Sequence, residues 1–137
     1  MIALTSIFGS CMKYPDGPVL TLRSSADRLS NFWVIDKYFE DGLDVTDEFN
    51  IHYASFVWRF SKDFSFDIYG QIDGVPWSRS GEWKFVESDR SIELLNQASD
   101  STYTFRIEKL KQKHLWLAQA DTVLHIFKQW RFKQKGK

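Results

Sequence analysis

Side chains that commonly carry chemistry are few in this sequence. Cys11 is the only cysteine, and the three histidines, His52, His114 and His125, lie far apart. One thiol cannot form a disulfide within the chain, and this histidine spacing matches no metal-binding motif. No nucleophile elbow, phosphate-binding loop or pair of carboxylates stands out. We therefore expect a protein that is not an enzyme, with no catalytic residues, no bound metal and no cofactor.

The residues before Cys11 suggest a different chemistry for its thiol. The stretch MIALTSIFG is apolar and uncharged, and Gly9 and Ser10 place small residues directly before the cysteine. This ending resembles the bacterial lipobox, in which the cysteine is lipidated and becomes the first residue of the mature protein. Phe8 stands where an aliphatic residue is commoner, and the charged start of a signal peptide is missing. We expect residues 1–10 to be a truncated lipoprotein signal segment; the alternative is a cytosolic N-terminus with a buried cysteine.

Lipidation would make Cys11 a membrane anchor. A cysteine that bears diacylglycerol carries several acyl chains, enough for stable attachment where a single chain is marginal. Residues 11–30 are then expected to form a tether, because MKYPDGP holds two prolines and a turn sequence that oppose a helix. At the end of the tether, SSADRLS predicts one helical turn with Ser24 or Ser25 as its N-cap.

The composition is that of an ordinary globular domain. At 137 residues, with 43% hydrophobic and 26% charged side chains, the chain is long enough for one core. Its 18 basic and 18 acidic residues balance, so no net field favours nucleic acid, and residues 134–137 form only a short basic tail. No stretch approaches the roughly 20 apolar residues of a membrane helix. We expect a monomer that does not bind nucleic acid.

From residue 31 onward, apolar and polar residues alternate with period two, and turn residues interrupt the pattern about every 8–12 residues. This spacing is typical of an all-β barrel or sandwich. Eight strands are expected, at residues 31–40, 54–61, 64–70, 78–87, 91–96, 101–109, 113–119 and 122–132. Sequential hairpins need no long crossover, so the pattern favours an eight-stranded antiparallel up-and-down barrel over residues 31–133, with a sandwich as the alternative.

Three places along the strand pattern carry more local expectations. The sequence VTDEFNIHY, residues 45–53, can form one helical turn after the first strand. The sequence QIDGVPW, residues 71–77, is expected to be a loop because it contains Gly74 and Pro76. In the last strand, Lys128 interrupts a face that is otherwise apolar.

Several segments, in this order, are similar to bacterial lipocalin-like domains, calycin-type β-barrels that occur as lipoproteins. RLSNFWVIDKYFEDGLDVTDEF resembles their opening, where a short turn leads into a Gly-x-Trp-type first strand. GEWKFVESDRSIELL followed by STYTFRIEKLKQKHLWL resembles their middle and later strands, and KYPDGPVLTLRS resembles the stretch after the lipid cysteine. The resemblance covers nearly the whole chain from Cys11 to Phe132, and the order of the motifs is more specific than any one motif.

The resemblance implies a family that is mostly not catalytic. It implies attachment to the outer membrane of a Gram-negative cell through Cys11, facing the periplasm. In lipocalins a basic residue of the last strand lies against the first-strand tryptophan, here Trp33. Arg131 is the nearest match, although it alternates out of phase with its neighbour Trp130. Asn31 departs from the family glycine, and glycine allows a closer backbone approach than asparagine does.

Aromatic residues make up 17% of the chain, and many share one face of a strand. If the aligned faces point inward, nine rings line the interior: Trp33, Phe56, Trp58, Phe66, Trp83, Phe85, Tyr103, Phe105 and Trp130. They could enclose a cavity for a small apolar or planar ligand, or interdigitate and fill the barrel as its core. A filled barrel would favour a structural or protein-interaction lipoprotein of the cell envelope. Its interface would be marked by outward-facing rings, if they cluster: Trp116, Tyr69 and Phe127.

Overall fold

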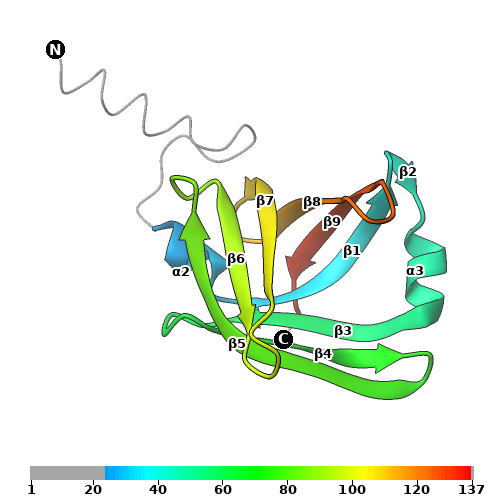
Figure 1. Ribbon diagram of the computed structural model, residues 1–137, viewed down its shortest axis with the longest axis horizontal. Coiled ribbons are helices and arrows are strands. Elements are labelled where there is room, and N and C mark those ends of the chain that lie inside the picture. Colours follow the sequence, from blue (N-terminus) through cyan, green and yellow to red (C-terminus); the bar gives the residue numbers. More distant parts are fainter. Residues whose placement is uncertain (1–23, 137) are drawn as a thin grey trace, which may run out of the picture.

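Eight antiparallel strands close into a barrel in the computed structural model, which describes residues 24–136 (Figure 1). The barrel strands are β1 (Phe32–Glu40), β3 (Tyr53–Phe60), β4 (Ser65–Ile72), β5 (Val75–Val86), β6 (Ser91–Asn96), β7 (Thr102–Leu110), β8 (His114–Asp121) and β9 (Ile126–Gln134). They follow one another around the barrel in chain order. A two-residue strand, β2 (Leu43–Asp44), pairs with the end of β1. The predicted all-β barrel with eight strands in up-and-down order is confirmed.

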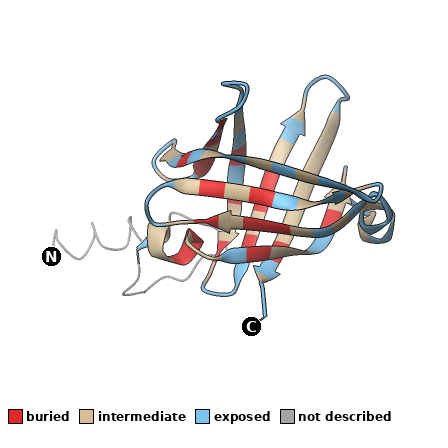
Figure 2. Ribbon diagram, turned by 90° about the horizontal axis from the view of Figure 1, so that it is seen from below, coloured by how far each residue is buried: buried red, intermediate tan, exposed pale blue. Residues whose placement is uncertain are grey.

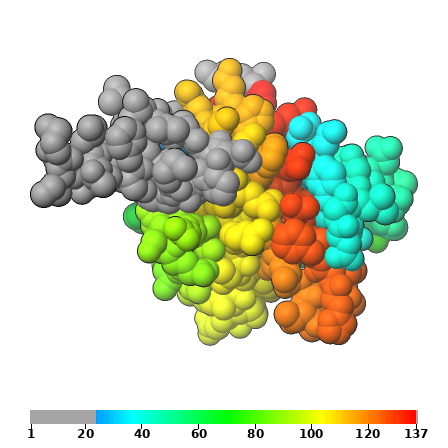
Figure 3. Space-filling view, turned by 90° about the horizontal axis from the view of Figure 1, so that it is seen from above, coloured from blue at the N-terminus to red at the C-terminus, as the bar shows by residue number. Residues whose placement is uncertain are grey.

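The barrel closes where its last strand meets its first. Strands β1 and β9 pair from Trp33 opposite Gln134 to Glu40 opposite Lys128, with an irregularity between Ile35 and Lys37. In Figure 3 the red end of the chain lies beside the cyan first strand, although the two are at opposite ends of the sequence. Pairing of β1 with β9 removes the two edges that an open eight-stranded sheet would expose, and such edges promote aggregation.

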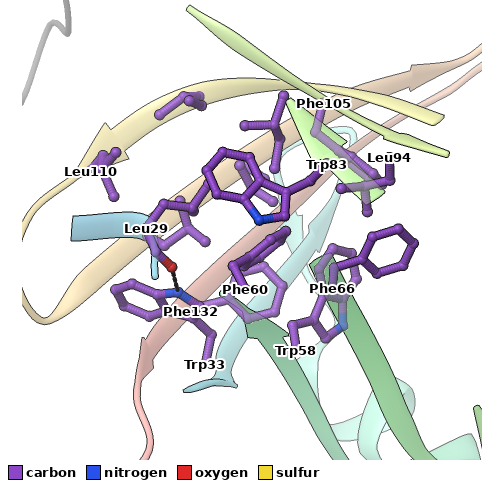
Figure 4. Close-up of a cluster of buried hydrophobic side chains, with 14 of the residues drawn as sticks. Leu29, Trp33, Trp58, Phe60, Phe66, Trp83, Leu94, Phe105, Leu110 and Phe132 are labelled. Atoms are coloured by element: carbon purple, nitrogen blue, oxygen red, sulfur yellow. Dashed lines mark hydrogen bonds between the residues drawn. The ribbon is translucent and has the colours of Figure 1, made fainter. Parts of the chain in front are cut away.

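One end of the barrel is closed by the short helix α2 (Ser25–Leu29). Ser24 caps this helix, because its Oγ accepts a hydrogen bond from the backbone N–H of Asp27 at 3.1 Å, as the sequence predicted. Leu29 at the end of α2 is fully buried, and its carbonyl oxygen accepts a hydrogen bond from the indole Nε1–H of Trp33 at 3.0 Å (Figure 4). The helix therefore acts as a plug that is fixed to β1.

The other end carries the helix α3 (Thr46–His52), which connects β2 to β3. It is longer than the single turn expected for residues 45–53. Its start is held by Asp44, whose Oδ1 accepts hydrogen bonds from the backbone N–H of Thr46 at 3.0 Å and from its hydroxyl at 2.5 Å. Phe49 of α3 packs on Tyr38 of β1, with ring centroids 4.6 Å apart, so the helix lies over this end of the barrel.

The expected loop at residues 71–77 is wrong, because most of it is strand. Strands β4 and β5 meet in a two-residue turn in which Asp73 and Gly74 have φ of 50° and 81°. Such left-handed Asp-Gly pairs are favoured in tight hairpins. Pro76 lies within β5 opposite Gln71. It is tolerated there because β6 ends opposite Gly81, so the N–H that proline lacks is not needed for pairing with β6.

The last strand begins four residues later than expected, at Ile126 rather than residue 122. Residues 122–125 form a turn, in which the carboxylate of Asp121 accepts hydrogen bonds from the backbone N–H groups of Val123 and Leu124 at 3.0 and 2.9 Å. Lys128 does not break the strand. It lines the interior and pairs with Asp121 across the β8–β9 hairpin at 3.2 Å.

The core is concentrated in the middle of the barrel and toward the α2 end (Figure 2). Its largest fully buried rings are Trp33, Phe60, Phe66, Trp83 and Phe132. Figure 4 shows these rings in one cluster that extends from Leu29, with side chains contributed from opposite walls. Dense packing of this kind leaves little room for a ligand in this half.

Part of the predicted N-terminal organisation lies outside the described residues. This applies to the signal segment at residues 1–10, to Cys11, and to the tether as far as residue 23. At the other end of the chain, Gln134 belongs to β9, and the backbone N–H of Lys135 donates to the carbonyl oxygen of Phe32 at 2.9 Å. The sheet thus reaches into the segment expected to be a basic tail.

Candidate ligand-binding cavity

A cavity of about 620 Å³ occupies the half of the barrel interior opposite α2. All eight barrel strands and α3 contribute to its wall. Among its lining residues are His52 and Leu124, which are exposed, so the cavity opens to solvent at the α3 end. Its volume falls within the roughly 300–1,000 Å³ of typical small-molecule sites.

Five of the nine rings expected in the interior line this cavity: Phe56, Trp58, Tyr103, Phe105 and Trp130. Three of them form a mutually packed floor. The Trp58 and Phe105 centroids are 5.6 Å apart, those of Phe105 and Trp130 are 5.3 Å apart, and those of Trp58 and Trp130 are 6.4 Å apart. Edge and tilted contacts of this kind are favourable for aromatic pairs and hold the rings in place.

The other four expected rings, Trp33, Phe66, Trp83 and Phe85, do not line the cavity. Trp33, Phe66 and Trp83 are buried in the core, and Phe85 is partly buried against Trp83 in an edge contact at 5.2 Å. Each points inward, as its alternation predicts, but from the α2 half of its strand. Alternation identifies the face of a strand and does not give the height along the barrel.

Aromatic side chains that were not expected at the site continue the wall toward the opening. Phe49 of α3 stacks on Tyr53 with centroids 4.7 Å apart, and Tyr53 contacts Phe56 edge-on at 6.0 Å. Trp77 of β5 packs against Phe56 at 5.7 Å. Phe49 lies on a helix, so no strand alternation could have identified it. Trp77 fell within the segment wrongly expected to be a loop.

Several polar groups in the wall of the cavity are paired. The hydroxyl of Tyr38 donates to Glu40 at 2.8 Å, and burial followed by this hydrogen bond raises the pKa of the Tyr38 phenol. Lys128 pairs with Asp121, whose pKa is lowered first by the backbone N–H of Leu124 and then by Lys128. The charges of Lys128 and Asp121 therefore compensate each other, and the Glu40 carboxylate is held by a hydrogen bond from Tyr38.

Unlike Lys128, Arg79 has no charged partner among the described residues. Its guanidinium carbon lies 4.9 Å from the ring centroid of Trp77 and 4.8 Å from that of Tyr103. It lines the cavity from β5 and is half-buried. Within residues 24–136, no carboxylate lies within ion-pairing distance of it. The inward orientation of Arg79 was predictable from the sequence, because Arg79 alternates in phase with the inward-facing Trp83.

Arg131 does not lie against Trp33, and this expectation from the resemblance is wrong. Its guanidinium carbon lies 4.6 Å from the Phe39 centroid and 4.0 Å from the Trp116 centroid. Arg131 alternates with Trp130, which lines the interior, so it belongs to the outer face. Arg131 therefore cannot reach the inward-facing Trp33, because it alternates out of phase with Trp130 along the strand. Trp33 bonds to α2 instead.

The outward-facing rings do not form one cluster. Trp116 of β8 is covered by Arg131 and by Lys109, whose Nζ lies 3.9 Å from its centroid. Phe127 of β9 lies under Arg106 at 5.8 Å. Tyr69 is on β4, four strands from β8 in either direction around the barrel. No apolar interface is therefore built from the three.

The described residues contain no group of three or more His, Cys, Asp or Glu side chains placed to hold a metal ion. In the same range, neither helix has the length and apolarity that crossing a membrane requires. The chain matches no family model and no curated protein sequence. The closed barrel is compatible with a lipocalin-like calycin fold.

Proposed function

We propose that this protein is a non-enzymatic binding protein that holds a small apolar or aromatic molecule in its barrel. The observation that carries the proposal is the cavity of about 620 Å³ whose floor is Trp58, Phe105 and Trp130. Rings held by one another keep the cavity open, and apolar surface on a ligand would be removed from water against them. The ligand would enter at the α3 end.

The barrel is further proposed to be a monomeric lipoprotein, anchored through Cys11 to the outer membrane and facing the periplasm. Support for this part comes from the sequence before and after Cys11. Mass spectrometry of the N-terminal peptide of protein taken from host membranes tests it, with diacylglycerol on Cys11 as the expected result. Loss of membrane attachment in Cys11→Ser is the matching expectation. An unmodified thiol in the native protein would overturn the anchor and leave the binding proposal standing.

The binding proposal is tested by native mass spectrometry of the protein purified gently from its own host. Additional mass that is lost on denaturation is the expected result. The neutral dye N-phenyl-1-naphthylamine should then bind the emptied barrel with increased fluorescence. A bare protein that also fails to enhance the dye would overturn the proposal and favour a structural or protein-interaction role.

A pair of variants on β4 locates the dye. Ile72 lines the cavity, so Ile72→Trp should fill part of it and weaken dye binding by about tenfold, equivalent to ~1.4 kcal/mol. Tyr69→Trp places the same ring on the outer face of the same strand and should leave binding unchanged. Equal effects of the two variants would mean that the dye binds elsewhere.

A further inference from the structure

Arg79 brings a positive charge to a wall that is otherwise aromatic. It projects from β5 on the same face as Trp77, and Tyr103 approaches from β7. Arg79 and Trp77 also line a second hollow of about 340 Å³ beside the end of β6. The guanidinium therefore lies near the opening, where the head of an elongated ligand would remain while its body reached the floor.

The guanidinium carbon of Arg79 lies within 5 Å of the ring centroids of both Trp77 and Tyr103. Ring contacts of this kind use none of the five N–H donors of a guanidinium as conventional hydrogen bonds. Within the described residues, Arg79 donates no side-chain hydrogen bond. Its donors are therefore available for charge-assisted hydrogen bonds with an anionic group.

The other charges of the wall do not supply that anion. Glu40 accepts from Tyr38, and Asp121 is paired with Lys128. Glu48, on α3, is exposed to water. Around the barrel, β1 is four strands from β6 in either direction, so Glu40 stands on the wall opposite the β5–β7 side that holds Arg79.

Resting on the proposed function, we propose that the ligand is an amphipathic organic anion whose charged group pairs with Arg79. Its apolar or aromatic body lies against the floor formed by Trp58, Phe105 and Trp130. Removing a half-buried cation from water without a counter-ion is unfavourable, and an anionic head restores the lost interaction. Arg79 therefore distinguishes anionic from neutral ligands of the same shape.

Two fluorescent dyes with the same N-phenylnaphthylamine body test this inference. 1-Anilinonaphthalene-8-sulfonate carries an anionic group, and N-phenyl-1-naphthylamine does not. In the full chain, Arg79→Gln should weaken binding of the sulfonate by at least about tenfold, because a hydrogen-bonded charge pair is lost. Binding of the neutral dye should be unchanged. In the unmodified protein, added salt should weaken binding of the sulfonate more than binding of the neutral dye.

Arg106→Gln is the matched control, because it removes the same charge from the outer face, where Arg106 pairs with Glu108 at 3.1 Å. It should change neither dye. Unaltered melting temperatures of both variants exclude misfolding as the cause. Equal effects of Arg79→Gln on the two dyes, or no effect on either, would overturn the anion inference while leaving the binding proposal intact. Failure of both dyes to bind the unmodified protein would overturn the two together.

Discussion

The indole N–H of Trp33 and the carbonyl oxygen of Leu29 are joined by a hydrogen bond of 3.0 Å, and both residues are fully buried. Through this bond the first barrel strand, β1, fixes the helix α2, which closes one end of the barrel. The arrangement satisfies the one polar atom of the indole at a place where water is absent. The hydrogen bond also keeps the Leu29 side chain among the core rings, so α2 and β1 form one unit.

Leu29→Ala should remove this plug and lower the free energy of unfolding by about 2–5 kcal/mol, because a buried leucine leaves a cavity behind. Chemical denaturation measures the change. Leu43→Ala is the control, since Leu43 on β2 is 68% exposed and its truncation should cost little. Similar losses in the two variants would contradict the role given to α2.

Gly81 should not tolerate a side chain. A Cβ at this position would collide with the backbone carbonyl oxygen of Leu95 and come within 3.0 Å of the Phe66 ring. Backbone cannot move aside as a flexible side chain can, so Gly81→Ala should destabilise the protein by at least about 2 kcal/mol. Thermal melting checks this, with Gly136→Ala, which has open space around it, as the control. A Gly81→Ala protein as stable as the unmodified one would mean that β5 and β6 separate freely.

Tyr38 should make the protein sensitive to alkali. Burial, followed by the hydrogen bond to Glu40, raises the pKa of its phenol above the unfolded value of about 10. Above that pH the unfolded state loses this proton more readily than the folded state, so the stability present below about pH 10 is lost as pH rises. Tyr38→Phe should be less stable at neutral pH by about 1 kcal/mol, and the difference should shrink by about pH 11.

Urea unfolding at the two pH values measures this difference. Tyr69→Phe, on the outer face of β4, controls for the loss of a phenol as such. A gap between the unmodified protein and Tyr38→Phe that stays constant with pH would refute the assignment.

Asp67 should stabilise the folded protein at neutral pH and not in acid. The Ser80 hydroxyl, which donates to Asp67 at 2.6 Å, and then Arg59 lower the pKa of this carboxyl. A lowered pKa gives stability that is present above the unfolded value of about 3.9 and lost as pH falls through the folded value. Asp67→Asn should cost roughly 0.5–1 kcal/mol at neutral pH, and the cost should vanish in acid. Denaturant melts at both pH values, with Asp100→Asn as control, check this.

The strand pattern was predictable because inside and outside alternate along each strand. Closure of one face around a core makes period two unavoidable in segments such as 91–96, whose bounds agree with β6. Local chemistry was harder to predict where a neighbour decides it. Pro76 is accepted because β6 stops short of it, and the charge of Lys128, which faces inward by alternation with Trp130, is tolerated because Asp121 pairs with it across the hairpin.

The cavity itself was not readable from the sequence. Trp83 and Tyr103 have the same inward alternation, yet one is packed in the core and the other lines the open half. The difference depends on how high each lies along the barrel axis, which is set by strand tilt and register. The helix α2 adds to the difference between the packed and the open half, because Leu29 reaches the core from outside the strand pattern. An inward arginine was visible, but its two ring partners come from strands that are not adjacent.

The pairing of Trp33 with Gln134 also sets the order of events during synthesis. Strand β1 emerges from the ribosome first among the strands, and one of its two edges has no partner until β9 has been made. Contacts so distant in sequence form slowly, since the chain between their ends must be ordered first. The nascent barrel therefore stays incompletely folded until β9 has been translated, and a truncation between β8 and β9 leaves the free edges of β1 and β8 open to other chains.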